Sequence, residues 1–539
     1  PKNGLKELFG IGNFTIEDTL LGFMRFYFFA FLISLSTIKA DTSSSRPNII
    51  IIYTDDHGWP DVGPAGIHKD LKTPHLDALA SSGVRCTDGY SSAPQCVPSR
   101  AGLMTGKYQN RINVPSNSSD LTTFNKELTV AEHLKKAGYM TGQIGKWHLG
   151  PGNKIGSHGF DFFFNKNANR PCWGNFDLSG KKSASQLKPH TAYHLDDCSA
   201  HALSFIRAQK NNPFFLYLAY RAPHVPLDAP QKHLDRFPGE MPERRRQALA
   251  MIAAMDDGVG AITAELAKHN LTKKTLIFYI GDNGAPLKIH KLDAPGGGPG
   301  WDGSLNEPLN GEKGMLTEGG IRVPFLVSWP GTIPAGRIYH RPVSALDATV
   351  TALELAGLQI PGLDGRNIIP QLKGDVSNDA HEALYWRWVG QTAIRQGDWK
   401  LLKNGTRTYL FDLSKDKAER NNLANKMSSR TTELTELLDA WEKTLPAPKF
   451  QKLSKQGSLY FDHYLDGKLQ PKPQPEKIDR DRPPSSAAIF KARDKNADGN
   501  VTLKEFIAGR TGDKVPVITR HFQRRDLNKN GIWEKSEIR

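Results

Sequence analysis

Residues 48–53 read Asn-Ile-Ile-Ile-Ile-Tyr, and Thr54, Asp55 and Asp56 follow them directly. A short run of β-branched residues without polar interruption is typical of a strand buried on both faces of a sheet. Similar apolar runs occur at residues 214–218, 276–280 and 323–328. The sequence therefore predicts a sheet with a buried interior rather than one with a solvated face.

Helical patterns lie between and after these runs. The stretches with helical spacing of apolar residues are 129–137, 194–208, 244–266 and 345–355. Buried strands that alternate with helices predict an α/β domain, with a mostly parallel sheet flanked by helices. We expect this domain over residues 46–385.

The pattern changes after residue 385. Short strands with alternating polar residues are expected at 392–395, 399–402 and 408–411, followed by an amphipathic helix at 431–443. These features predict a smaller antiparallel α+β subdomain over residues 386–446. Residues 447–486, which end in a charged, proline-rich stretch, are expected to be a linker. Residues 487–539 are expected to form a separate tail.

The composition narrows the class of protein. The chain has 539 residues, a formal net charge of +15, 38% hydrophobic residues, 24% charged residues and four cysteines. These values exclude a polytopic membrane protein, a wholly disordered chain and a disulfide-dense miniprotein. The positive charge suits an anionic partner, which composition alone leaves open as nucleic acid, lipid or an acidic substrate.

The N-terminal region carries an export pattern. From Met24 a basic residue precedes an apolar run to Ile38, and a small residue, Ala40, follows. The run is shorter than the roughly 20 residues of a spanning helix, so residues 24–40 predict a cleaved signal peptide and an exported, secreted or periplasmic protein. An uncleaved membrane anchor is the alternative. Residues 1–23 are interpreted as upstream sequence from a wrong start.

Two of the expected strands end in oxygen-bearing pairs. Asp55 and Asp56 follow the first strand, and Asp282 and Asn283 follow the strand at 276–280. Ligands of open α/β sheets bind beyond the carboxyl ends of the strands. Carboxylate and amide oxygens there would suit Ca²⁺ or Mg²⁺, although either pair alone could simply cap a turn.

Residues 96–106, Cys-Val-Pro-Ser-Arg-Ala-Gly-Leu-Met-Thr-Gly, fit the pattern C-x-P-S-R-x-x-L-x-T-G at all seven fixed positions. Pro98 is expected to open a helix, with Cys96 just before its N-terminus. This stretch resembles the signature of the type I, formylglycine-dependent sulfatases of the alkaline phosphatase superfamily. The resemblance extends over residues 46–445 and implies an alkaline-phosphatase-like fold.

The resemblance also implies site residues. Cys96 would be oxidised to formylglycine by a formylglycine-generating machinery, and Ca²⁺, with Mg²⁺ as the alternative, would bind at residue 96 together with the two oxygen-bearing pairs. The implied metal ligands are Asp55, Asp56, Cys96, Asp282 and Asn283. The implied catalytic residues are Cys96, Arg100, Lys146, His148, His224 and Lys313, of which Lys146, His224 and Lys313 would contact the sulfate.

These roles agree with the chemistry of sulfate esters. Attack on a sulfur shielded by charged oxygens requires fixed positive charge. A hydrated aldehyde at residue 96 offers two hydroxyls, one to attack sulfur and one to re-form the aldehyde and expel sulfate. Lys313 or His224 would protonate the leaving alcohol, and His148 would act as the base in the second step.

The tail contains two twelve-residue stretches that match the EF-hand calcium loop, at 494–505 and 526–537. The expected ligand positions are Asp494, Asn496, Asp498, Asn500 and Glu505 in the first loop, and Asp526, Asn528, Asn530, Ile532 and Glu537 in the second. Only two residues follow the second loop, so its exiting helix is nearly absent and its affinity is in doubt.

The sequence thus predicts a sulfatase that acts on a sulfated carbohydrate or polysaccharide, without nucleic acid and without stable membrane insertion after signal cleavage. A phosphonate or phosphodiester hydrolase of the same superfamily and a catalytically inactive calcium-dependent binding protein remain as alternatives. The sugar, the sulfated position and a disulfide between Cys172 and Cys198 stay open.

Overall fold

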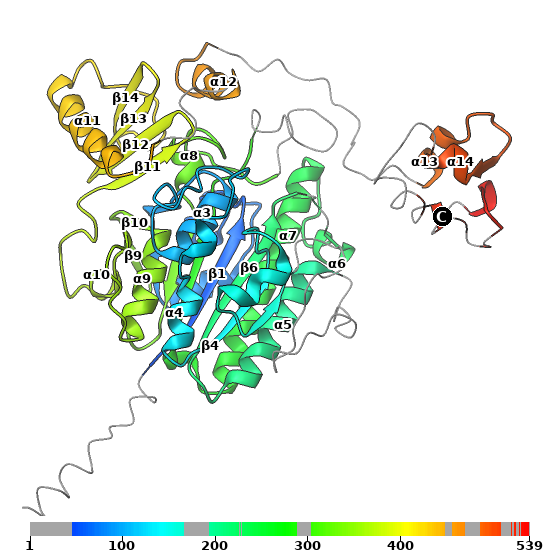
Figure 1. The fold of residues 1–539 in the computed structure, drawn as a ribbon, viewed down its shortest axis with the longest axis horizontal. Helices are drawn as coiled ribbons and strands as arrows, with labels where there is room; N and C mark the ends of the chain where they lie inside the picture. The colour runs from blue at the N-terminus through cyan, green and yellow to red at the C-terminus, as the bar shows by residue number, and fades with distance from the viewer. Residues whose placement is uncertain are drawn as a thin grey trace, which may run out of the picture.

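The computed structural model describes residues 46–165, 193–287 without 226 and 228, 303–447, 455–468, 486–507 and most of 519–537 (Figure 1). The expected upstream segment (1–23), the signal peptide (24–40), the proline-rich stretch at 471–485 and Cys172 lie outside these residues.

An eight-stranded sheet forms the centre of the larger part of the chain. Its strand order is β5-β4-β6-β1-β7-β8-β2-β9, and all neighbouring pairs are parallel except those that involve β8. The strands are β1 (Asn48–Asp55), β2 (Val84–Cys86), β4 (Met140–Gly145), β5 (Phe162–Phe164), β6 (Phe214–Pro223), β7 (Thr275–Gly281), β8 (Phe325–Ser328) and β9 (Arg337–Tyr339). The expected mostly parallel sheet is confirmed.

Strand β1 shows why this sheet is buried on both sides. Its isoleucines are fully buried, and they alternate between two hydrophobic clusters. Ile49 and Ile51 pack with residues of α3 (Cys96–Thr105), α4 (Val130–Lys136) and α9 (Ala345–Leu355). Ile50 and Ile52 pack with residues of α2 (Pro74–Ser81), α5 (His194–Gln209) and α7 (Glu243–Lys268). Successive side chains of a strand point to opposite faces, so one run of isoleucines serves both cores.

The helices cover the two faces of the sheet (Figure 1). One face carries α3 (Cys96–Thr105), α4 (Val130–Lys136) and α9 (Ala345–Leu355), and the other carries α2 (Pro74–Ser81), α5 (His194–Gln209) and α7 (Glu243–Lys268). Shorter elements are α6 (Gln231–Leu234), α8 (Glu318–Ile321), α10 (Ile369–Lys373), β3 (Gly89–Tyr90) and β10 (Val343–Ser344). The four helices expected from the sequence are all present.

A separate antiparallel sheet follows, as expected, with four strands where the sequence indicated three. It consists of β11 (Leu384–Trp388), β12 (Gln391–Gln396), β13 (Trp399–Asn404) and β14 (Arg407–Asp412), with α11 (Ser428–Lys443) after it. Strand β11 runs across the expected boundary between residues 385 and 386, so that boundary requires correction. The reason is that β11 pairs with β12 from residue 384 onward.

The linker expected over residues 447–486 is also corrected. It contains helix α12 (Lys455–Tyr464), in which Tyr460 and Phe461 are buried against residues of the antiparallel sheet. Two adjacent aromatic residues give no helical periodicity, which is why the sequence did not indicate the helix. Residues 455–468 therefore belong to the folded part of the chain.

The tail contains α13 (Ser486–Arg493), β15 (Asn500–Thr502), α14 (Leu503–Ile507) and β16 (Ile532–Glu534). The two strands pair antiparallel, with Val501 opposite Trp533. Both residues are fully buried in a cluster with Phe490, Phe506 and Phe522.

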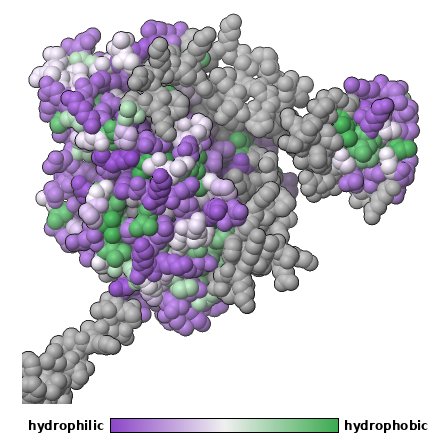
Figure 2. Space-filling view, in the orientation of Figure 1, coloured by the Kyte–Doolittle hydropathy of each residue, from purple (hydrophilic) through white to green (hydrophobic). Residues whose placement is uncertain are grey.

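The described surface in Figure 2 is mostly hydrophilic, with hydrophobic residues in small separate groups. None of the described helices combines the length and the apolar character needed to cross a membrane.

Candidate active site

The register of the central strands brings the oxygen-bearing pairs together. In the parallel pair β1–β7, Thr54 lies opposite Gly281, so Asp55 and Asp282 follow at the same level. On the other side of β1, Asp55 lies opposite Pro223 of β6, which places His224 at this edge as well. The carboxyl ends of three adjacent strands thus supply one cluster of side chains.

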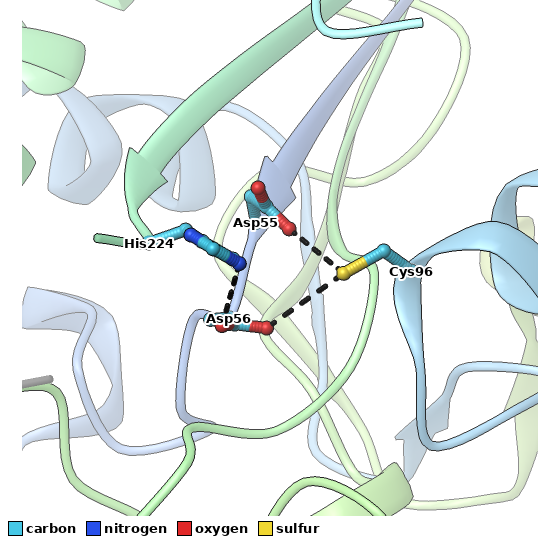
Figure 3. A group of neighbouring side chains, drawn as sticks. All are labelled: Asp55, Asp56, Cys96 and His224. Atoms are coloured by element: carbon cyan, nitrogen blue, oxygen red, sulfur yellow. Dashed lines mark hydrogen bonds and ion pairs between the residues drawn. The ribbon is translucent and has the colours of Figure 1, made fainter. Parts of the chain in front are cut away.

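Cys96 approaches this cluster from the first turn of α3 (Figure 3). Its Sγ lies 3.2 Å from Asp55 Oδ1 and 4.0 Å from Asp56 Oδ1, and the residue is 1% exposed. Gln95 is the N-cap, so Cys96 is the first helical residue and not the residue before the helix. Burial and the charges of Asp282 and Asp55 raise the pKa of the Cys96 thiol, which makes the unmodified cysteine a poor nucleophile.

Arg100 lies one turn further along α3 and is fully buried. Its Nη2 and Nε donate to the same oxygen of Asp282, at 2.7 and 3.1 Å, and its Nη1 donates to the Tyr217 hydroxyl at 3.0 Å. The guanidinium is thus directed at the carboxylate of Asp282 and lies 3.7 Å from Asp55. This geometry orients the oxygen-bearing cluster.

Two lysines bring positive charge to the first pair of carboxylates. Lys146 Nζ lies 2.5 Å from Asp55 Oδ2, and Lys313 Nζ lies 2.7 Å from Asp56 Oδ1. Although burial acts to raise the pKa of Asp55, the Lys146 charge holds it well below its usual value. Asp282 differs, because burial and the Asp55 charge raise its pKa to about 7. Asp55 and Asp282 therefore have different proton affinities.

His224 follows β6 and faces Asp56, with 3.5 Å between its Nε2 and Asp56 Oδ2 (Figure 3). Its Nδ1 lies 2.6 Å from the carbonyl oxygen of Val225, so Nδ1 donates there and Nε2 is directed into the site. Burial, which outweighs the attraction of Asp55 and Asp56, lowers the pKa of His224 to about 3. This histidine is neutral near pH 7.

His148 lies at the exposed rim of the site, after the end of β4. Its φ of 59° falls in the left-handed region, as does the φ of 58° at Asp56. Such conformations are unusual for residues other than glycine and cluster at functional sites. Lys146 is buried and His148 is exposed, so these two side chains do not share one face of the segment after β4.

A metal ion fits the donor set of the cluster. Asp55, Asp56, Cys96 and His224 each present a ligand atom, and these atoms lie within 4.8 Å of one another. Asn283 Oδ1 is buried and has no hydrogen-bond partner within the described part of the chain. Its Nδ2 donates 2.7 Å to Asp56 Oδ1, which leaves the oxygen for another ligand. A hard cation would satisfy this oxygen.

Sequence reasoning gave no role to His57, which follows Asp56 directly. His57 is fully buried, and its Nε2 lies 2.6 Å from the carbonyl oxygen of Asp61. Its Nδ1 lies 3.2 Å from both Thr54 Oγ1 and the Tyr279 hydroxyl. His57 thus closes the turn after β1, and its position directly after Asp56 is the sequence signal that could have indicated it.

The two expected calcium loops of the tail have similar internal hydrogen bonds. In the first, Asp494 accepts from the backbone nitrogens of Asp498 and Gly499 at 3.1 Å. In the second, Asp526 accepts from those of Asn530 and Gly531 at 3.1 and 2.9 Å. All ten expected ligand residues lie in the described part, and β15 and β16 pair the two loops.

Comparison with known proteins identifies the family. The Sulfatase family model matches residues 47–358, and the model for the C-terminal region of N-sulphoglucosamine sulphohydrolase matches residues 311–444. N-acetylgalactosamine-6-sulfatase of Rattus norvegicus is 32% identical over 403 residues, which cover 68% of this chain and 74% of that protein. Steryl-sulfatase of Mus musculus is 28% identical over 539 residues, which cover 76% of this chain and 83% of that protein.

A solved structure extends the similarity to the fold. The crystal structure of Ps i-CgsB in complex with k-i-k-neocarrahexaose aligns with a TM-score of 0.66 and 31% identity, and covers 78% of this chain and 97% of that chain. The relatives named above are sulfuric ester hydrolases. We conclude from the sheet, the strand-end cluster and these matches that the chain belongs to the sulfatase family.

Proposed function

We propose that this sulfatase hydrolyses sulfate esters of a carbohydrate, with residue 96 converted to formylglycine and one divalent cation bound beside it. The observation that carries the proposal is the placement of Cys96 Sγ 3.2 Å from Asp55, at the edge where Asp56, Asp282 and Asn283 also meet. The substrate class is supported by the galactosamine sulfatase and the neocarrahexaose complex named above.

Asp55, Asp56, residue 96, Asp282 and Asn283 would hold the cation, with Ca²⁺ favoured by an all-oxygen donor set after conversion of the cysteine. The bound cation would supply fixed positive charge against the anionic ester and against the nucleophile. Formylglycine would supply a hydrated aldehyde with two hydroxyls on one carbon. An unmodified thiol lacks the second hydroxyl, and its raised pKa keeps it protonated.

The lysines of the site would bind the sulfate oxygens, because their ammonium groups already lie beside the carboxylates that face residue 96. Fixed positive charge in a buried site stabilises the negative charge that develops in the transition state. Arg100 donates to Asp282 and orients that ligand. We therefore assign Lys146 and Lys313 to the substrate and Arg100 to the metal side.

Two residues could protonate the leaving alcohol, and their charge states differ. Burial acts to lower the pKa of Lys313, but Asp56 and the neighbouring acidic groups hold this pKa above its usual value. His224, with a pKa lowered to about 3, carries no proton on Nε2 to donate near pH 7. This difference favours Lys313 as the proton donor; His224 would contact a sulfate oxygen only with a proton on Nε2, because a bare ring nitrogen and a sulfate oxygen both accept hydrogen bonds. His148 at the rim remains the candidate base for the second step.

The test is sulfate release from a panel of sulfated mono- and oligosaccharides by enzyme produced together with a formylglycine-generating machinery. Phosphonate monoesters and phosphodiesters belong in the same panel, since faster turnover of these compounds would replace our proposal with the alternative activity. Peptide mass spectrometry at residue 96 shows whether the cysteine sulfur has been lost. An active enzyme with an intact thiol at this position would contradict the formylglycine assignment.

Cys96→Ala should abolish turnover while the protein remains folded, because Ala provides no nucleophile. Cys86→Ala is the matched control: Cys86 is also a buried cysteine, but it lies in β2, away from the strand ends that form the site. Loss of turnover in both variants would indicate damage to the fold rather than loss of the nucleophile.

The tail supports a second, separate proposal. We infer that residues 494–505 and 526–537 form a pair of EF-hand calcium sites. The two loops have the same pattern of internal hydrogen bonds, and they pair with each other through Val501 and Trp533, which occupy equivalent positions in the two loops. Calorimetric titration with Ca²⁺ tests this inference, with Glu505→Gln and Glu537→Gln as variants that each remove one twelfth-position carboxylate. Calcium binding unchanged in both variants would overturn it.

A further inference from the structure

Helix α12 lies beyond the last residue, 444, that either family model matches. Its residues have no part in the cluster of catalytic side chains described above. The helix nevertheless connects the antiparallel sheet with the segment that carries Lys313, and this connection has a consequence for catalysis.

One side of α12 is fixed to the antiparallel sheet. Phe461 is fully buried, and its ring centroid lies 5.8 Å from that of Tyr409 on β14. Arg407 Nη1 lies 2.8 Å from Asp462 and 3.2 Å from Asp466, and the Tyr409 hydroxyl donates to Asp466 at 2.8 Å. Both apolar and ionic contacts therefore hold the helix on β14.

The C-terminal end of α12 contacts the segment before Lys313. The Tyr464 hydroxyl donates to Glu312 Oε1 at 2.8 Å, and Asn310 Nδ2 donates to the carbonyl oxygen of Tyr464 at 2.9 Å. These contacts span 152 and 154 residues of sequence. Through these two contacts the helix touches the site segment directly.

Glu312 passes this restraint to its neighbour. Glu312 is fully buried, and its other oxygen accepts from the backbone nitrogen of Leu287, on the loop that follows Asn283. The backbone nitrogen of Lys313 donates to Ala285 in the same loop at 3.1 Å. The side chain of Lys313 enters the site, and its Nζ lies 2.7 Å from Asp56 Oδ1. Tyr464, Glu312 and Lys313 thus form a continuous path from α12 into the site.

We propose that α12 acts as a strap that fixes the position of the Lys313 ammonium, with Tyr464 as a positioning residue that works through Glu312. The proposal rests on the sulfatase function proposed above only for its kinetic consequence. A charged hydrogen-bond acceptor with a fixed donor has a defined orientation, and small displacements of a catalytic group reduce the rate strongly. The hydroxyl of Tyr464 therefore matters for turnover although it lies outside the reacting cluster.

The experiment compares Tyr464→Phe with Tyr409→Phe in the full-length protein. Both variants remove one tyrosine hydroxyl that donates to a carboxylate and anchors α12, but only Tyr464 contacts Glu312. For Tyr464→Phe we expect kcat on a sulfated sugar to fall about five- to fiftyfold with KM changed by less than about twofold. For Tyr409→Phe we expect kcat to stay within about twofold of the wild type, with any loss confined to thermal stability.

A second measurement does not depend on turnover. Lys313 is 4% exposed, so its amine should react slowly with acetic anhydride, and peptide mass spectrometry can follow the rate. Tyr464→Phe should raise the labelling rate of Lys313 several-fold, and Tyr409→Phe should leave it unchanged. An unchanged rate in Tyr464→Phe, or an equal rise in both variants, would overturn the proposal.

A double-variant comparison tests the path through Glu312. If Tyr464 acts through this carboxylate, the combination of Tyr464→Phe with Glu312→Gln should lower kcat by no more than about twofold beyond Glu312→Gln alone. If the double variant instead lost the product of the two single-variant factors in kcat, the path through Glu312 would be contradicted. A wild-type enzyme that releases no sulfate would instead refute the proposed function, and the labelling rates would still decide on the strap.

Discussion

Lys400 of β13 and Glu318 at the start of α8 form a fully buried ion pair, with 2.8 Å between Nζ and Oε1. Glu419 completes the group: its Oε1 lies 2.8 Å from the same Nζ, and its Oε2 accepts from the backbone nitrogen of Glu318 at 2.6 Å. The group joins the antiparallel sheet to the helix that follows the Lys313 segment. It is thus a second connection between the sheet and the site.

Replacement of Lys400 should destabilise the protein strongly. Lys400→Met would leave two buried carboxylates without their shared cation, which costs about 3–5 kcal/mol in comparable cases. Lys403→Met is the matched control on the same strand, because the Lys403–Asp439 pair is partly exposed and should contribute at most about 1 kcal/mol. Urea unfolding measures both values. Equal losses would mean that burial does not set the strength of the pair.

Glu419 should make stability depend on pH. Burial, with Glu318 adding to it and Lys400 opposing it, raises the pKa of Glu419 to about 7. An unfolded glutamate titrates near a pKa of about 4.3, so the folded state holds the proton more tightly. The resulting stabilisation is complete below about pH 4 and is lost as the pH rises toward about 7.

We therefore expect the Glu419 contribution to the free energy of unfolding to fall by up to about 1.4 kcal/mol per pH unit within this window. Glu419→Gln removes the titration. The difference between variant and wild type, measured by urea unfolding from pH 5 to 8, should change across that range. A constant difference would show that Glu419 does not titrate there.

Asn283 should affect cation binding. Because its Oδ1 is buried without a partner in the described residues, Asn283→Ala should raise the cation concentration for half-maximal activity at least about tenfold. Chelator-treated enzyme titrated with Ca²⁺ and with Mg²⁺ gives this concentration, and activity reports the catalytic site rather than the tail. Asn367→Ala, at a half-buried asparagine that donates to the exposed Glu354, is the control. An unaltered titration in Asn283→Ala would remove this residue from the ligand set.

Substrates with different leaving groups distinguish between the two candidate proton donors, Lys313 and His224. If Lys313 is the donor, Lys313→Met should lower kcat/KM for a sugar sulfate by about 10²–10⁴-fold, and much less for an aryl sulfate whose phenol leaves without protonation. His224→Asn should lower both by similar factors, because a histidine that only contacts the sulfate contributes equally to the two substrates. A loss in His224→Asn that depends on the leaving group would reverse the assignment.

The tail should be dispensable for small substrates. Deletion of residues 482–539 leaves α12 and its contacts intact, so kcat/KM on a small sulfate ester should stay within about tenfold, equivalent to about 1.4 kcal/mol. Deletion of residues 448–539 also removes α12 and should reduce turnover further. Equal activities of the two truncated chains would argue against the role of α12, and a large loss in the shorter deletion would assign the tail to the active enzyme.

The sequence allowed prediction of the cluster because the register of parallel strands is simple. Asp55 and Asp282 each follow a buried apolar run, and neighbouring parallel strands place such positions at one edge. The connection between Tyr464 and Glu312 could not be predicted in this way. It links residues 152 positions apart, and Tyr464 belongs to no periodic pattern or motif.

The first turn of α3 shows a smaller difference of the same kind. The motif located Cys96 near a helix start, but the helix begins at the cysteine itself because Gln95 takes the N-cap position. Helix ends are decided by such local contacts. The path of the chain at His148 likewise depends on the left-handed backbone of Gly145, His148 and Gly150, which residue spacing alone does not reveal.

The burial of Cys96 sets an order of events for maturation. At 1% exposure, and with its sulfur between α3 and the strand-end carboxylates, this side chain is out of reach of any modifying enzyme once the domain has formed. If residue 96 is converted as we propose, conversion must precede folding, and the two processes compete in time. A variant that folds faster would then be, molecule for molecule, the less active preparation.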